Sequence, residues 1–214
     1  AENHNSATWI RVSITGQGPV ARGLHSAVPL PDGRMLMFGG SVTESQVLND
    51  VWVLALEPGM SAGAWIQVDT RGGPPARRAG HSSVITSGGH GASGSHMVVF
   101  GGLTIKNPRQ PVVTLNDSWV LSMDTGATTG TWTKLVTSGG PPVARGLHSA
   151  AMSSSGKMRM FGGMGHGPNI MGDMWELSLE SDVAGSWMEV HAPDAFPPAR
   201  AGNSLTFLGE HKTA

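Results

Sequence analysis

The residues best suited to chemistry in this 214-residue chain are four arginines that recur with the same neighbours. Each arginine follows a proline-containing turn and precedes a histidine or an asparagine by three positions. The four pairs are Arg22 with His25, Arg78 with His81, Arg145 with His148, and Arg200 with Asn203. A guanidinium group binds a carboxylate through two parallel hydrogen bonds. These arginines could therefore bind an acidic partner or pair with carboxylates of the chain itself.

The spacing of the arginines shows that the chain is built from internal repeats. Successive arginines are 56, 67 and 55 residues apart, and a tryptophan series recurs at the same intervals. That series is Trp9, Trp65, Trp132 and Trp187. Two further motifs recur between the arginines. The first is the sequence FGG, at 38–40, 100–102 and 161–163. The second is a turn with an acidic residue followed by a tryptophan, at 48–52, 115–119 and 171–175. A long repeat of this kind must be identified before any single residue is interpreted.

Each repeat contains four short apolar runs separated by turn residues. In the first repeat these runs are 24–30, 34–38, 51–56 and 65–68. Glycine and proline interrupt the chain too often for a sustained helical period. Four short strands at this repeat length predict a blade of a β-propeller, in which the large tryptophan rings fill the space between blades. Gly-Gly after the second run suits a left-handed backbone or a close approach to a neighbour.

The order of the motifs, R-x-x-H-S, then FGG, then N-D-x-W, then W, resembles kelch repeats from about Trp9 to Leu208. The resemblance implies an all-β, kelch-type β-propeller of three complete four-stranded blades. We expect these blades at about 23–69, 79–136 and 146–190, with partial strands at 8–12 and 203–208. One departure is leucine at the three positions where kelch repeats usually carry tyrosine, Leu54, Leu121 and Leu177.

Three blades with two partial strands predict a fragment of a larger ring. The alternatives are a ring assembled from two or more copies and an atypical small ring. The strand edges of an open arc would favour self-association.

In a propeller the first strand of each blade is innermost. Arg22, Arg78, Arg145 and Arg200 would then surround one mouth of the central channel. The resemblance adds that, in some kelch proteins, arginines before the innermost strand bind acidic peptide segments. The structural alternative is that each arginine pairs within the framework, with Asp50, Asp117 or Asp173.

Residues that do not recur are the other candidates for binding. They lie in the loops 41–48, 87–96, 103–113 and 164–170, and loops are where such scaffolds place their binding residues. Arg109, in the longest loop, and His166, in the sequence GMGHGPN, are the side chains we expect to contact a partner.

No residue pattern predicts catalysis, a metal site or a cofactor. Three recurring histidines could suggest a metal, but the spacing between blades holds them apart, and Asn203 fits a hydrogen-bonding role better. The chain has no cysteine and no tyrosine, which excludes the copper chemistry of galactose-oxidase-like relatives. No paired-carboxylate motif stands out, so a non-enzymatic role is favoured.

Composition limits the choice of partner. The net charge is −1 with scattered basic residues, so nucleic acid is not an expected partner. No apolar run is long enough for a membrane helix, and the first residues lack a signal-peptide pattern. The cellular compartment is not determined by the sequence, with the cytoplasm slightly favoured.

These observations together predict a protein-interaction module. It would bind a protein or peptide partner, acidic in one interpretation, through the channel mouth and the loops between strands. Two alternatives remain open, a propeller that binds or isomerises a small molecule such as a sugar, and an accessory propeller of a larger enzyme.

Overall fold

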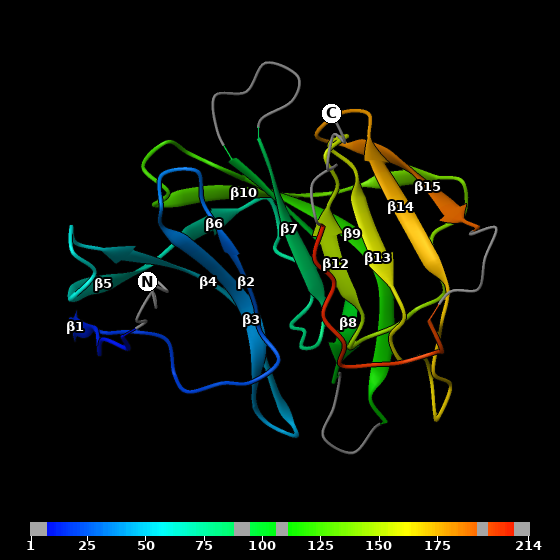
Figure 1. The fold of residues 1–214 in the computed structure, drawn as a ribbon, viewed down its shortest axis with the longest axis horizontal. Coiled ribbons are helices and arrows are strands. Elements are labelled where there is room, and N and C mark those ends of the chain that lie inside the picture. Colours follow the sequence, from blue (N-terminus) through cyan, green and yellow to red (C-terminus); the bar gives the residue numbers. More distant parts are fainter. Residues whose placement is uncertain (1–7, 88–94, 106–110, 192–196, 208–214) are drawn as a thin grey trace, which may run out of the picture.

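A computed structural model describes residues 8–87, 95–105, 111–191 and 197–207 of the chain. These residues form three five-stranded β-sheets and no helix (Figure 1). Accordingly, the described residues contain no helix that could cross a membrane. The prediction of an all-β fold built from blade-like sheets is confirmed.

Each sheet uses one repeat of the sequence. Sheet 1, in the order β1-β5-β4-β3-β2, contains β1 (Ser13–Thr15), β2 (Ser26–Pro29), β3 (Met35–Thr43), β4 (Gln46–Leu56) and β5 (Ala62–Gln67). Sheet 2, in the order β6-β10-β9-β8-β7, contains β6 (Asp69–Arg71), β7 (Ser82–Ser87), β8 (Ser95–Thr104), β9 (Val113–Met123) and β10 (Thr129–Lys134). Sheet 3, in the order β11-β15-β14-β13-β12, contains β11 (Val136–Ser138), β12 (Ser149–Met152), β13 (Met158–Phe161), β14 (Met174–Leu179) and β15 (Ala184–Val190).

Four strands of each sheet are antiparallel, as the sequence predicts, and the fifth is an addition. The short strands β1, β6 and β11 pair in parallel with β5, β10 and β15 at the outer edge of each sheet. Strand β6 directly follows β5 of sheet 1 but belongs to sheet 2, and β11 links sheets 2 and 3 in the same way. These three-residue strands tie each sheet to the preceding repeat. Their short, largely exposed sequences carry no apolar pattern that could reveal them.

The partial strands expected at 8–12 and 203–208 do not form in the described residues. Residues 8–12 and 203–207 have no strand geometry, and residue 208 lies outside the described part. A strand is stable only when a neighbour satisfies its N–H and C=O groups. Among the described residues, neither segment pairs with a strand through backbone hydrogen bonds, and Trp9 is fully exposed.

The three sheets stack side by side, with the first strands β2, β7 and β12 next to one another at the centre (Figure 1). A tryptophan of each later sheet packs on the phenylalanine of the preceding FGG. The ring centroids of Trp132 and Phe38 are 4.8 Å apart, as are those of Trp187 and Phe100. Trp132 and Trp187 therefore fill the space between blades as the sequence predicts, whereas Trp9 of the same series is fully exposed.

The middle sheet is apolar on both faces because it packs against a neighbour on each side. Alternate residues of its strands point in opposite directions. Met97, Val99 and Leu121 pack toward sheet 1. Val98, Phe100 and Val120 pack toward sheet 3, and all six side chains are almost fully buried.

The recurring histidines connect neighbouring repeats by hydrogen bonds. His81 Nε2 lies 2.7 Å from Ser26 Oγ of the preceding repeat, and His148 Nε2 lies 2.7 Å from Ser82 Oγ. In the fourth copy, the amide of Asn203 donates to Ser149 Oγ. The hydrogen-bonding role predicted for this series is therefore present in each of these copies.

The glycine pair of FGG allows the next repeat to approach closely. Gly39 has φ +63°, and a Cβ there would lie 2.8 Å from the carbonyl oxygen of Arg78. The N–H of Gly40 donates to the same carbonyl at 2.9 Å. A larger residue at position 39 would therefore clash and adopt an unfavourable backbone conformation.

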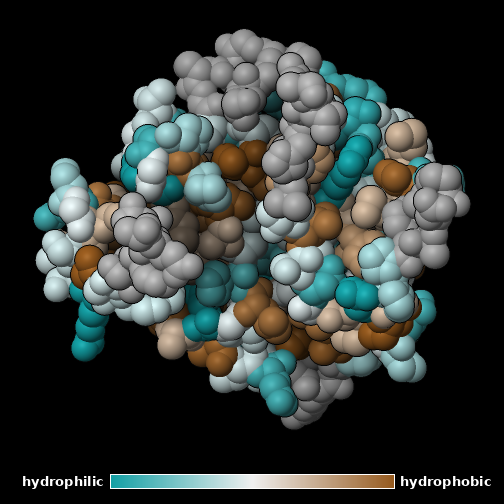
Figure 2. Space-filling view, viewed as in Figure 1, coloured by the Kyte–Doolittle hydropathy of each residue, from teal (hydrophilic) through white to brown (hydrophobic). Residues whose placement is uncertain are grey.

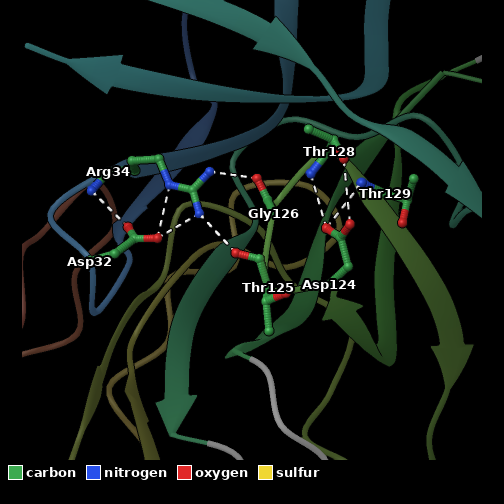
Figure 3. Close-up of polar contacts among 7 residues, drawn as sticks. All are labelled: Asp32, Arg34, Asp124, Thr125, Gly126, Thr128 and Thr129. Atoms are coloured by element: carbon green, nitrogen blue, oxygen red, sulfur yellow. Dashed lines mark hydrogen bonds and ion pairs between the residues drawn. The ribbon is translucent and has the colours of Figure 1, made fainter.

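A second link between sheets 1 and 2 lies at the opposite ends of the strands (Figure 3). Arg34 Nε and Nη2 donate to Asp32 Oδ2, and its Nη1 and Nη2 reach across to the carbonyls of Gly126 and Thr125. Asp124 organises that turn by accepting hydrogen bonds from the N–H groups of Thr128 and Thr129.

The buried histidines predict that the fold loses stability in mild acid. Burial, with the nearby charge of Arg145, lowers the pKa of His148 to about 3, and burial lowers the pKa of His81 well below its ordinary value. Both rings stay neutral in the folded state, whereas in the unfolded chain they accept a proton near pH 6.5. Stability is therefore complete above about pH 6.5 and falls as the pH is lowered toward the folded-state pKa values, by roughly 1.4 kcal/mol per histidine at about pH 5.5.

Urea unfolding at about pH 7.5 and pH 5.5 measures this loss. The double variant His81→Asn and His148→Asn should flatten the pH dependence, because Asn203 makes the equivalent contact in the fourth copy. His166→Asn, at an exposed loop position, is the matched control and should leave the pH dependence unchanged. An unchanged slope in the double variant would contradict the assignment.

Candidate partner-binding surface

Three of the four recurring arginines form the same polar triad with an aspartate and a tryptophan. In the second repeat, Arg78 Nη1 and Nη2 donate to the two carboxylate oxygens of Asp117 at 2.8 and 2.9 Å. Trp119 Nε1 donates to the same carboxylate at 2.7 Å. The first and third repeats repeat these contacts with Arg22, Asp50 and Trp52, and with Arg145, Asp173 and Trp175.

Each arginine of a triad also binds the backbone on both sides. Arg78 Nε donates to the carbonyl of Ala76, and its Nη1 donates to the carbonyl of Gly101 in the FGG motif. One guanidinium group therefore joins the turn before the first strand to the second and third strands. The carbonyl oxygen of Arg78 also accepts a hydrogen bond from the N–H of Gly40 in the preceding repeat. The triad therefore fixes the position of the turn that precedes the first strand.

The triads hold their aspartates in the charged form. Burial alone would raise the pKa of Asp117, but the hydrogen bonds and charge of Arg78 and the hydrogen bond of Trp119 outweigh it and lower the pKa. The same balance lowers the pKa of Asp50 and Asp173. The arginine and aspartate remain an ion pair across the neutral pH range.

Burial leaves Arg22, Arg78 and Arg145 little surface to offer a partner. Their side chains are 3%, 0% and 0% exposed, and their guanidinium groups are already hydrogen-bonded within the repeat. These observations favour the framework interpretation of the three arginines over direct binding.

The remaining predicted binding residues lie in different environments. Arg200 is exposed, and within the described residues its side chain donates only to the carbonyl of Pro198 and has no carboxylate partner. His166 is exposed in the loop after the third FGG. Arg109 lies outside the described residues. The structure thus does not bring the predicted residues together into one site.

A groove lies between the first two repeats. Its volume is about 570 Å³, and it lies where β3 and β8 run into their loops. Apolar residues form most of its wall, with polar residues at one side. The lining comprises Leu24, Val47, Ala79, Leu103, Ile105, Pro111 and Val112, with Ser41, Glu44 and Ser45. Figure 2 shows hydrophobic surface between the lower ends of β3 and β8.

Two of the segments that the sequence analysis predicted as loops form this groove, although β3 and β4 extend into 41–48 and β8 extends into 103–113. Ser41 to Val47 lie in the predicted loop 41–48, and Leu103 to Val112 lie in the predicted loop 103–113, of which residues 106–110 are outside the described part. Because these loops differ between repeats, the groove is specific to this pair of repeats rather than part of the repeated framework.

Leu24 is the residue of the groove that the sequence analysis did not identify. Its backbone is left-handed, with φ 56°, and 54% of the residue is exposed. The equivalent positions in the second and fourth copies are Gly80 and Gly202, which adopt φ 62° and 69°. Glycine occupies this conformation without strain, whereas leucine pays about 1–2 kcal/mol. The signal was present in the sequence as leucine aligned with glycine across the repeats.

Leu147 shows what leucine does at the same position when it has a structural role. Its backbone is also left-handed, with φ 57°, and its side chain lies over Gly80 of the preceding repeat. Leu147 is half-buried by this contact. Leu24 lies in the first repeat of this sequence, which contains no earlier equivalent of Gly80 for it to cover, and its side chain borders the groove.

The described residues contain no group of three or more histidine, aspartate or glutamate side chains that could hold a metal ion. The polar groups of the groove wall are a single carboxylate, Glu44, and two serine hydroxyls. This arrangement is suited to binding apolar groups with polar contacts at one side.

The triad predicts a large and local effect on stability. Asp117→Asn leaves the buried Arg78 without a charged partner, so we expect the free energy of unfolding to fall by roughly 3 kcal/mol. Asp32→Asn removes a carboxylate from the more exposed pair with Arg34 and should cost less than about 1 kcal/mol. Urea unfolding of both variants provides the measurement, and equal losses would contradict the buried-triad interpretation.

Comparison with known proteins agrees with this arrangement of repeats. The family model described as "KLHDC2/KLHL20/DRC7 Kelch-repeats domain" matches residues 2–213. Adagio protein 3 of Arabidopsis thaliana is 32% identical over 204 residues, which cover 95% of this chain and 30% of that protein. Host cell factor 2 of Homo sapiens is 30% identical over 225 residues, covering 96% of this chain and 26% of that protein. The chain thus spans about a third or less of these relatives.

Two solved structures share the fold. A chain of the "Cryo-EM structure of RAG in complex with one melted RSS and one unmelted RSS" gives a TM-score of 0.62 at 16% identity, over 84% of this chain and 55% of that chain. The "Structure of YjhT" gives a TM-score of 0.55 at 18% identity, over 85% and 54% of the two chains. These likenesses concern the fold alone. With its repeated Arg–Asp–Trp triads, its FGG turns and a family match along nearly its whole length, the chain belongs to the kelch-repeat family.

Proposed function

We propose that this chain is a protein-interaction scaffold whose groove between the first two repeats binds an extended, largely apolar segment of a partner protein. Kelch-repeat membership supports the scaffold role in general. The observation that carries the specific site is the mainly apolar wall of this groove, to which Leu24, Leu103 and Val112 contribute.

The composition of the groove supports a peptide rather than a small polar ligand. A polar small molecule such as a sugar needs several convergent hydrogen-bonding groups. The groove offers mainly aliphatic side chains, and Val112 is 45% exposed there. Exposed apolar surface of this kind, bordered by polar residues, marks sites of protein–protein contact.

A selection experiment tests the proposed groove. Peptides selected from a random displayed library with the wild-type chain should be rich in apolar residues. Val112→Asp should weaken their binding at least about tenfold, because a charge would be placed in the apolar contact. Val136→Asp, at a 76% exposed position in β11, is the matched control and should have less than about a twofold effect. Equal effects of the two variants would contradict the groove as the site.

Leu24→Gly separates stability from binding. Glycine at this position removes the backbone strain of the left-handed conformation, but it also increases the conformational entropy of the unfolded chain. The free energy of unfolding should therefore stay equal or rise by up to about 1 kcal/mol. Binding of the selected peptides should weaken, because the apolar edge of the groove is lost. Leu147→Gly should instead reduce stability, since it removes the packing over Gly80.

The same proteins can be screened against sugars by thermal shift. Under the proposed function, no sugar raises the melting temperature of the wild type. A sugar that raises it, with the increase lost in Val112→Asp, would favour the small-molecule alternative.

A further inference from the structure

The two walls of the groove between the first two repeats differ in chemistry. One wall is the end of the β3–β4 hairpin, whose turn is formed by Glu44 and Ser45. The other wall is the end of the β8–β9 hairpin, in which Thr104 pairs with Val113. Both hairpin ends point toward the bottom of Figure 1. A segment bound between them therefore contacts a different hairpin on each of its two sides.

The wall formed by the β8–β9 hairpin is apolar in the part that the structure describes. Its lining residues are Leu103, Ile105, Pro111 and Val112. Val112 is 45% exposed, so an apolar ligand would remove additional apolar surface from water there. Lys106 and Arg109 belong to the same loop in the sequence but lie outside the described residues. Among the described residues, this wall offers contacts to apolar side chains only.

The wall formed by the β3–β4 hairpin offers hydrogen-bond acceptors. The hydroxyl of Ser41 already donates its proton to the carbonyl of Thr43, so it has only lone pairs to offer a ligand. Ser45 Oγ lies 3.4 Å from Thr43 Oγ1, and one of these two hydroxyls donates to the other. Glu44 is exposed, and its carboxylate accepts hydrogen bonds without donating any. This wall therefore suits a ligand group that donates hydrogen bonds.

Glu44 gives the acceptor wall a negative charge. It is the only charged residue among the described residues that line the groove. Its carboxylate forms no ion pair or hydrogen bond with any other described residue. An apolar side chain placed against this carboxylate would displace water without replacing its hydrogen bonds, which is unfavourable. A lysine or arginine side chain would supply both the donors and the opposite charge.

The geometry of an extended peptide converts this difference into a sequence pattern. Successive side chains of an extended segment point to opposite sides. Every second side chain would therefore face the apolar wall at Ile105 and Val112, and the side chains between them would face Ser41 and Glu44. A segment that fits both walls alternates apolar with hydrogen-bond-donating residues.

We propose that the groove binds an extended partner segment in which apolar residues alternate with polar ones, with a lysine or arginine opposite Glu44. This inference rests on the proposed function and narrows the largely apolar segment proposed there to one with a basic side. Charge complementarity with Glu44 and the apolar β8–β9 wall are the two observations that carry it.

The test uses the full chain and three short fluorescein-labelled peptides. Valine alternates with lysine in the first, with glutamine in the second and with glutamate in the third. Fluorescence anisotropy should show that the valine–lysine peptide binds about threefold more tightly than the valine–glutamine peptide, as expected for one partly exposed ion pair. The valine–glutamate peptide should bind most weakly. Added salt should reduce the differences among the three peptides.

Variants of Glu44 connect this preference to one carboxylate. Glu44→Gln should abolish the preference for lysine over glutamine and change the binding of the valine–glutamine peptide less than about twofold. Glu57→Gln, at an exposed glutamate directly after β4 at the opposite end of that strand, is the matched control and should keep the preference. Glu44→Lys should reverse the order, so that the valine–glutamate peptide binds most tightly. A purely structural role of Glu44 would not exchange one ligand preference for another, and thermal melts check that each variant is folded.

The outcomes separate this inference from the proposed function. If Val112→Asp weakens the binding of all three peptides while Glu44→Gln leaves the lysine preference intact, the groove remains the site and the basic pattern is wrong. Equal effects of Glu44→Gln and Glu57→Gln, or no binding of the valine–lysine peptide, would also overturn the inference. If the peptides bind and Val112→Asp changes none of them, the proposed function fails as well.

Discussion

The structure depends on a simple constraint, that a sheet with two apolar faces needs a neighbour on each side. Sheet 2 meets this constraint fully, because Met97 and Val99 pack toward sheet 1 while Val98 and Phe100 pack toward sheet 3. Trp132 supplies the largest contact at the first of these junctions, on Phe38. Burying such side chains provides most of the free energy that holds a repeat protein together. The polar motifs then determine how the sheets are aligned.

Three kinds of polar contact set this alignment at the inner end of the repeats. The Arg–Asp–Trp triads fix the turn before each first strand, the glycine pair admits the neighbouring backbone, and the histidines bridge to the preceding serine. All three recur because each junction between repeats needs them. Residues that differ between repeats are released from this role, which is why the groove between the first two repeats is a better candidate for binding than the recurring triads of the framework.

Most of the fold could be predicted from the sequence, since equal spacing of arginine and tryptophan landmarks defines the repeats and turn residues define the strands. The short strand β6 could not, because three exposed residues carry no pattern and their pairing depends on the next repeat. Residues 8–12 have the pattern of a strand, but they pair with no segment among the described residues.

The candidate sites were harder to predict than the fold. Arg78 has the chemistry of a binding residue, and only its burial and its pairing with Asp117 show that it serves the framework. Leu24 could be noticed in the sequence as a leucine aligned with Gly80, but only the structure places it in the wall of a groove. A search for sequence motifs gives most weight to residues that recur in every repeat. Leu24 is informative for the opposite reason, because it differs from its counterpart in the next repeat.

The central claim, that each repeat stacks its tryptophan on the preceding phenylalanine to hold adjacent sheets together, is tested most directly by a double-mutant cycle. Phe38→Leu, Trp132→Leu and the double variant would be compared by urea unfolding. The 4.8 Å contact between the two rings predicts a coupling energy of about 1 kcal/mol. Strictly additive losses, with a coupling energy near zero, would contradict the stacking of these two repeats.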